Sequence, residues 1–134
     1  MIWTTQAPKM GDIIRVKVKF YHHYGVYLDD EHIVQFGLPD NTGLDPETIA
    51  VTVTDMDGFR MGKEPETAKL TPMERLKRHS PKKTKELALG RVGETGYNIL
   101  HNNCEHFVNE CVFGKHESSF VAGVRTEIRN KCEK

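Results

Sequence analysis

The chain has 134 residues, of which 28% are charged and 37% hydrophobic, a composition typical of one soluble globular domain. The formal net charge is zero, which argues against non-specific binding to nucleic acid. No apolar run is long enough to span a bilayer, and residues 1–11 lack the apolar segment of a signal peptide. Three cysteines form no disulfide-scaffold pattern and suit a reducing compartment. We therefore expect one cytoplasmic domain over residues 1–134, with no transmembrane segment and no nucleic-acid partner.

The first half of the chain has the pattern of β-strands. Apolar and polar residues alternate over 13–20, which predicts a half-buried strand, and again over 49–54. Short β-rich runs at 23–28 and 32–36 predict two more strands, joined by a tight hairpin. Residues 37–46 are rich in Gly, Pro, Asn and Asp and predict a loop.

The second half has the pattern of helices. Thr71-Pro72-Met73-Glu74 is a capping box with proline at the first helical position, and Ser80-Pro81 begins another helix that ends near Gly93. Residues 55–69 contain few apolar residues and two glycines, and we expect a mobile flap there. Basic residues between 77 and 85 have no aromatic residues among them, which indicates a solvated helix face or a weak contact with anionic lipid headgroups. Strands followed by helices predict an α+β domain with an antiparallel sheet.

A cysteine stands where the last helix is expected to begin. Asn103 is a good N-cap residue, and Glu105 lies in the first turn, where the helix dipole favours negative charge. Apolar residues recur at helical spacing from Cys104 to Cys111, and Gly114 offers a stop. A helix N-terminus stabilises a thiolate, and its free N–H groups stabilise an oxyanion. The plain alternative is that Cys104 is a small buried side chain in the core.

A thiol nucleophile needs an imidazole base and a group that orients the imidazole. His22 and His23 begin the second strand and face opposite sides of the sheet. Gln35, on the neighbouring strand, can accept a hydrogen bond from an imidazole N–H, whereas His32 has the opposite parity. For His23 and Gln35 to share a face, we predict a three-residue loop that pairs Leu28 with His32 and Gly25 with Gln35. The absence of an Asn-Gly or Asp-Gly dipeptide disfavours a two-residue turn.

A zinc site is the rival interpretation of the same segment. His101, Cys104, His106 and Cys111 are all zinc-binding residue types. Structural zinc sites usually pair their ligands as C-x2-4-C or H-x3-5-H, whereas H-x2-C-x-H-x4-C on one helix start directs the side chains apart. We therefore expect no metal and no organic cofactor.

Two motifs together resemble those of the lecithin:retinol acyltransferase-like family. The cysteine motif is the run from Asn103 to Phe107, and the resemblance extends to Gly96-Tyr97-Asn98 before it and to Asn109-Glu110 after it. The run from Phe20 to Tyr27 is similar to the family's histidine motif, and Gly11-Asp12 to its start. The resemblance spans roughly residues 9–114; residues 115–134 form a polar tail with one apolar stripe (Phe120, Val121, Val124 and Ile128).

The resemblance implies a circularly permuted papain-like fold and an acyl-enzyme in which a cysteine carries the acyl group as a thioester. It assigns Cys104 as the nucleophile and His23 as the base. Gln35 matches the third position, where the lipid enzymes commonly have a second histidine. Tyr21 matches a tyrosine beside the base and, with the Cys104 backbone, would bind the oxyanion. The implied substrates are lipid acyl esters. With the basic residues between 77 and 85, a peripheral contact with a membrane surface is a further expectation.

Two other functions remain open at this point. Permuted papain-like peptidases that remove ubiquitin-like modifiers also resemble a strand histidine followed by an Asn-Cys helix start. A noncatalytic binding module would keep the fold and lack a fast-reacting Cys104. The Glu105-His106 pair fits the acyltransferase family better than the isopeptidases.

Overall fold

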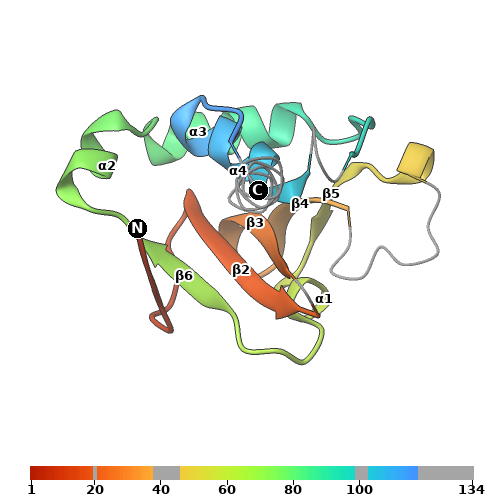
Figure 1. The fold of residues 1–134 in the computed structure, drawn as a ribbon, viewed down its shortest axis with the longest axis horizontal. Helices are drawn as coiled ribbons and strands as arrows, with labels where there is room; N and C mark the ends of the chain where they lie inside the picture. Colours follow the sequence, from red (N-terminus) through yellow and green to blue (C-terminus); the bar gives the residue numbers. More distant parts are fainter. Residues whose placement is uncertain (20, 38–45, 99–102, 118–134) are drawn as a thin grey trace, which may run out of the picture.

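A computed structural model of the chain describes residues 1–19, 21–37, 46–98 and 103–117. It confirms an α+β domain in which helices pack on an antiparallel sheet (Figure 1). The strands are β1 (Ile2–Thr4), β2 (Asp12–Val18), β3 (Tyr21–Asp29), β4 (His32–Phe36), β5 (Val51–Thr54) and β6 (Glu66–Lys69). The α-helices are α1 (Met56–Arg60), α2 (Pro72–Lys77), α3 (Pro81–Gly90) and α4 (Cys104–Phe113), and a 3-10 turn spans Pro46–Thr48.

The six strands form one sheet in the order β1-β6-β2-β3-β4-β5. The four predicted strands are the central and right-hand part of this sheet, from β2 to β5 (Figure 1). β6 lies between β1 and β2, with Thr67 opposite both Thr4 and Ile14. Its pairing partners are more than fifty residues away in the sequence, so a local pattern could not reveal it.

The two faces of the sheet have separate apolar cores. Helices α3 and α4 cover one face, where the even-numbered residues of β3 meet the apolar stripe of α4 around Phe107 (Figure 1). On the other face, Phe59 of α1 is fully buried. It is surrounded by side chains of the central strands: Ile14, Val16, Val18, Tyr27 and Ile33. Successive residues of β3 therefore serve different cores.

Residues 55–69, predicted as a mobile flap, contain ordered elements, so that prediction is wrong. α1 begins after Asp55, whose side chain accepts from the Gly58 N–H, and it ends at Met61 in the left-handed conformation. The segment then returns to the sheet as β6. Phe59 anchors α1 to the core, and the pairing of β6 with β1 and β2 holds the rest of the segment; a count of apolar residues reveals neither.

The hairpin between β3 and β4 has the predicted register but not the predicted loop. Gly25 pairs with Gln35 as expected, whereas His32 pairs with Asp29 and the register shifts at Leu28. The turn is therefore the two residues Asp30 and Glu31, combined with a β-bulge. Asp29 Oδ1 accepts from the Glu31 N–H at 2.9 Å and lies 2.8 Å from His32 Nδ1. These contacts stabilise a two-residue turn although it lacks the Asn-Gly or Asp-Gly dipeptide that favours one.

The predicted helices are present. Thr71 and Glu74 form the capping box of α2, and Ser80 caps α3, which ends at Gly90 rather than near Gly93. Among the described residues, none of the helices has both the length and the apolar content needed to cross a membrane. The predicted 37–46 loop falls largely outside the described residues, as do Cys132 and the apolar stripe of the tail.

Candidate active site

The start of α4 is held by reciprocal capping. The Asn103 side chain accepts hydrogen bonds from the backbone N–H groups of Glu105 and His106, both at 3.0 Å. His106 Nδ1 accepts in return from the Asn103 backbone N–H at 3.0 Å. This arrangement is a capping box in which histidine takes the place usually held by Glu or Gln. Gly114 ends the helix with a φ of 70°.

The Cys104 sulfur lies against the main chain on both sides of His23. Cys104 Sγ is 3.9 Å from the carbonyl oxygen of His22, and the Tyr24 backbone N–H is directed at the same sulfur. Burial raises the pKa of the Cys104 thiol to about 11, more than the backbone N–H groups of Tyr24, Cys104 and Glu105 lower it. The backbone N–H groups at the helix start therefore lower the pKa of the thiol, as expected, but burial raises it by more. The resting group is a thiol.

His23 is fully buried and forms a hydrogen bond with Gln35. Its Nε2 lies 2.8 Å from Gln35 Oε1, as predicted from the hairpin register. Because an amide oxygen only accepts, Nε2 carries the ring proton and Nδ1 keeps its lone pair. Nδ1 has no hydrogen-bond partner within the described part of the chain. Burial lowers the pKa of His23 to about 4, against the opposing effect of Gln35, so the ring is neutral at pH 7.

Two side chains that sequence reasoning missed support this imidazole. The Phe59 ring packs beside the His23 ring, with centroids 5.1 Å apart. A Cβ at Gly25 would lie 2.7 Å from Phe59 Cε2, so glycine is needed for this close approach. Thr52 Oγ1 lies 3.5 Å from Gln35 Nε2 and contacts the far end of the orienting amide. Each contact joins segments distant in sequence, so no local motif signals it.

The other tyrosine, histidine and cysteine candidates differ in how deeply they are buried. Tyr21 begins β3, is half-buried and packs against the core around Phe59. His22 is also half-buried, and burial lowers its pKa. Cys111 is in the core, as predicted, and burial raises its pKa to about 12. His32 is exposed at the turn, beside Asp29.

The zinc interpretation finds no support in the described residues. Among them, no three His, Cys, Asp or Glu side chains are grouped as a metal ion requires. His106 uses Nδ1 in the cap of α4 and stacks on His116, with centroids 4.1 Å apart. His101 lies outside the described residues.

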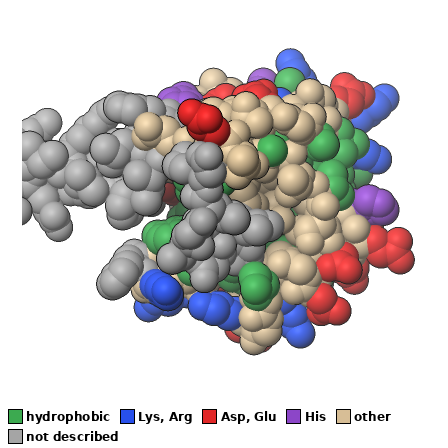
Figure 2. Space-filling model, turned by 90° about the vertical axis from the view of Figure 1, so that its right-hand side faces the viewer, with side chains coloured by type: hydrophobic (Ala, Val, Ile, Leu, Met, Phe, Trp, Pro, Cys, Tyr) green, Lys and Arg blue, Asp and Glu red, His purple; other side chains and the backbone are tan. Residues whose placement is uncertain are grey.

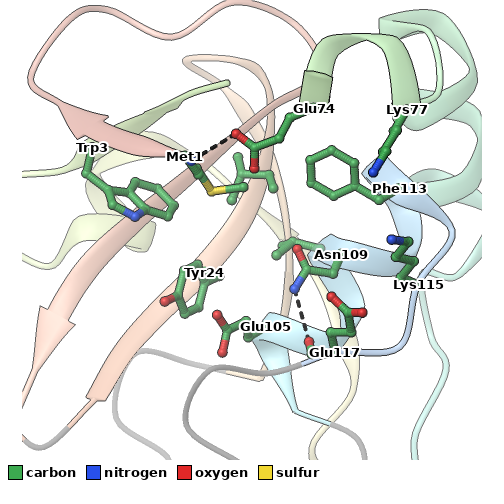
Figure 3. A pocket seen from close by; sticks show the side chains of 12 residues that line it. Met1, Trp3, Tyr24, Glu74, Lys77, Glu105, Asn109, Phe113, Lys115 and Glu117 are labelled. Atoms are coloured by element: carbon green, nitrogen blue, oxygen red, sulfur yellow. Dashed lines mark hydrogen bonds and ion pairs between the residues drawn. The ribbon is translucent and has the colours of Figure 1, made fainter. Parts of the chain in front are cut away.

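A cavity of about 280 Å³ lies between β1, α2 and α4 (Figure 3). Tyr24 and Glu105, the chain neighbours of His23 and Cys104, line one end of it. Trp3, Val108 and Phe113 give it an apolar wall, while Lys77, Lys115 and Glu117 are among its charged lining residues. The cavity can therefore take an apolar chain with a polar end near Tyr24 and Glu105.

Comparisons with known proteins agree on one family. The sequence model for "Lecithin retinol acyltransferase" matches residues 6–117. The chain is 29% identical over 126 residues to human phospholipase A and acyltransferase 3, covering 87% of this chain and 78% of that protein. It is 27% identical over 125 residues to rat lecithin retinol acyltransferase, covering 78% of this chain and 54% of that protein. Human phospholipase A and acyltransferase 1 is 29% identical over 123 residues, 81% of this chain and 69% of its own length.

Proposed function

Because the chain belongs to the lecithin retinol acyltransferase family, we propose that it is a thiol-dependent acyltransferase or acyl hydrolase acting on lipid esters. The names of its relatives give the two activities, phospholipase A and acyltransferase. One observation carries the proposal to this chain. A cysteine at a helix start lies against the backbone that flanks a buried histidine, and Gln35 holds the histidine so that Nδ1 is left to accept a proton.

In the proposed reaction the proton rests on sulfur until substrate arrives, because the thiol pKa of about 11 lies well above the imidazole pKa of about 4. As Cys104 Sγ attacks the ester carbonyl, its proton moves to His23 Nδ1 and an S–C bond forms. The carbonyl oxygen takes the negative charge, and the Cys104 backbone N–H, with Tyr21, stabilises it. Gln35 holds the imidazolium in line through its hydrogen bond to Nε2.

The tetrahedral intermediate then collapses. The ester C–O bond breaks, His23 gives its proton to the leaving alkoxide, and the acyl group remains on sulfur as a thioester. Water, or the hydroxyl or amine of an acceptor, attacks the thioester carbonyl while His23 Nδ1 takes the acceptor's proton. The S–C bond breaks, the thiolate recovers the proton, and Cys104 returns as a thiol. Hydrolysis and transfer differ only in the acceptor, and both proceed on the permuted papain-like arrangement that we propose for this fold.

Turnover of a phospholipid by cysteine variants tests this function. We expect Cys104→Ser to remove both release of fatty acid and transfer to an added amine, because an alkoxide is far harder to form than a thiolate. Cys111→Ser is the matched control, since Cys111 is buried in the same helix, and it should keep most of the activity. Equal loss in a folded Cys111→Ser variant would overturn the assignment of the nucleophile. A fully folded wild type that neither hydrolyses nor transfers acyl groups would favour a binding module.

A further inference from the structure

Helix α2 leaves its outer face uncovered. It is a six-residue helix with no buried residue, and it lies at the end of the molecule near the N-terminus (Figure 1). Met73 and Leu76, one turn apart, have exposed fractions of 62% and 83%. The Met1 nitrogen lies 2.9 Å from Glu74 Oε1, which brings β1 beside α2, and the adjacent Ile2 is 64% exposed. We call Met1, Ile2, Met73 and Leu76 the docking face.

Positive charge is concentrated in the segment that contains α2 and the first half of α3. Residues 69–85 contain seven Lys or Arg side chains and one Glu, a formal charge of +6 (seven minus one), in a chain whose total is zero. The rest of the sequence therefore has a formal charge of −6. The opposite end of the molecule carries both signs of charge, with acidic side chains gathered toward the lower right of the view (Figure 2). An anionic surface would therefore attract the α2 end.

The docking face adjoins the cavity that Tyr24 and Glu105 line. Met1 of the docking face lines the cavity, together with Glu74 and Lys77 of α2 (Figure 3). Glu105 and Tyr24 line the same cavity next to Cys104. A molecule leaving a surface on which α2 rests would therefore have this cavity next to it.

We propose that the docking face inserts into anionic lipid bilayers, with Met73 and Leu76 in the acyl-chain boundary and the surrounding Lys and Arg side chains on the headgroups. Short amphipathic elements bind in this way through buried apolar area and electrostatic attraction. The inference deepens the proposed function, on which it rests, because it says how a lipid ester reaches Cys104. A second copy of the chain fits less well, since four side chains fall far short of the roughly 800 Å² per partner of a stable interface.

The test compares partitioning of the full chain onto vesicles by sedimentation, without any turnover. The Met73→Ser/Leu76→Ser variant should lose about tenfold or more of its partitioning onto vesicles of mixed phosphatidylserine and phosphatidylcholine. Met61→Ser is the matched control, because Met61 is 60% exposed but lies at the end of α1, on the other side of the sheet. It should partition as the wild type does. Partitioning of the wild type should fall with added salt and with omission of phosphatidylserine.

Activity then separates docking from chemistry. The double variant should lose turnover of vesicle phospholipid but keep turnover of a short-chain, monomeric ester, which needs no surface. Unchanged partitioning of the double variant, or equal loss in Met61→Ser, would overturn the proposal. The proposal would also be overturned if light scattering showed that the wild type is a dimer and the double variant a monomer. If the wild type partitions as expected but turns over neither substrate, the docking proposal stands and the proposed function fails.

Discussion

At the scale of single residues, the pair formed by His23 and Gln35 is the most informative feature of the molecule. A buried, neutral imidazole has its protonated nitrogen fixed by an amide oxygen at 2.8 Å, and its other nitrogen is ready to accept a proton. Glutamine can orient this ring and does not itself titrate. A second histidine in the same place would change its own charge near neutral pH. The neutral state of the proposed base is therefore set mainly by burial, which outweighs the opposing effect of the Gln35 hydrogen bond on the His23 pKa.

Loss of the orienting amide should slow the reaction without stopping it. We expect Gln35→Ala to reduce kcat roughly tenfold to a hundredfold, because nucleophile and base remain and only the alignment of the imidazole suffers. Gln35→His should retain activity, since its ring can also contact His23 Nε2. Thr52→Val removes only the 3.5 Å contact at the far end of the amide and serves as the control. Steady-state kinetics measure all three, and an unaffected Gln35→Ala enzyme would reduce the triad to a Cys104–His23 dyad.

Burial of His23 should make stability depend on pH in a defined window. The folded pKa of about 4 lies below the ordinary value of 6.5, so the unfolded chain binds the proton more tightly between these values. Stability is therefore full above pH 6.5 and falls as pH drops toward 4, by about 3 kcal/mol for this group. Urea unfolding of wild type and His23→Gln measures it: the stability advantage of the wild type should shrink across this window. An advantage that stays constant, as expected for the exposed control His32→Gln, would contradict the burial argument.

At the scale of secondary-structure elements, the start of α4 is positioned by its cap. Asn103 Oδ1 accepts two backbone N–H groups, so Asn103→Ala leaves both without this acceptor. We expect the free energy of unfolding to fall by about 1 kcal/mol. We also expect kcat to fall, because Cys104 is the first residue of the helix and depends on the cap for its position. Asn103→Asp should recover most of both, since a carboxylate accepts the same hydrogen bonds. A stability loss with unchanged kcat would show that the cap does not position the sulfur.

The elements also show what a sequence can and cannot predict. The strands β2 to β5 and the helix starts at Thr71, Ser80 and Asn103 follow from local periodicity and capping chemistry, and they were predicted. The register that places Gln35 beside His23 was predicted too, although through a wrong loop, because side-chain contacts of Asp29 stabilise the shorter turn. β6 and the contact between Phe59 and His23 depend on pairing between distant segments. A local pattern contains no information on such pairs.

At the scale of the whole molecule, the central strands of the sheet contribute side chains to both apolar cores. In β3, Tyr24 and Val26 pack in the core under α4, whereas His23 packs beside Phe59 on the other face. The proposed nucleophile is therefore on a helix that covers one face of the sheet, and the proposed base is on a strand of the sheet. Cys104 reaches the backbone of β3 at His22 and Tyr24, the two chain neighbours of His23. The same arrangement buries the thiol, which explains its raised pKa. The α2 end carries the positive charge that we assign to lipid contact.

The central claim is that Cys104 carries the acyl group, and intact-mass analysis tests it most directly. The protein is incubated with mixed phospholipid vesicles, quenched in acid and weighed, and the modified residue is located by peptide mapping. We predict a fatty-acyl adduct on Cys104 that hydroxylamine removes, that persists in Cys111→Ser, and that is absent from Cys104→Ser. Turnover without any adduct on Cys104, or an acyl group found on Cys111 instead, would contradict the account.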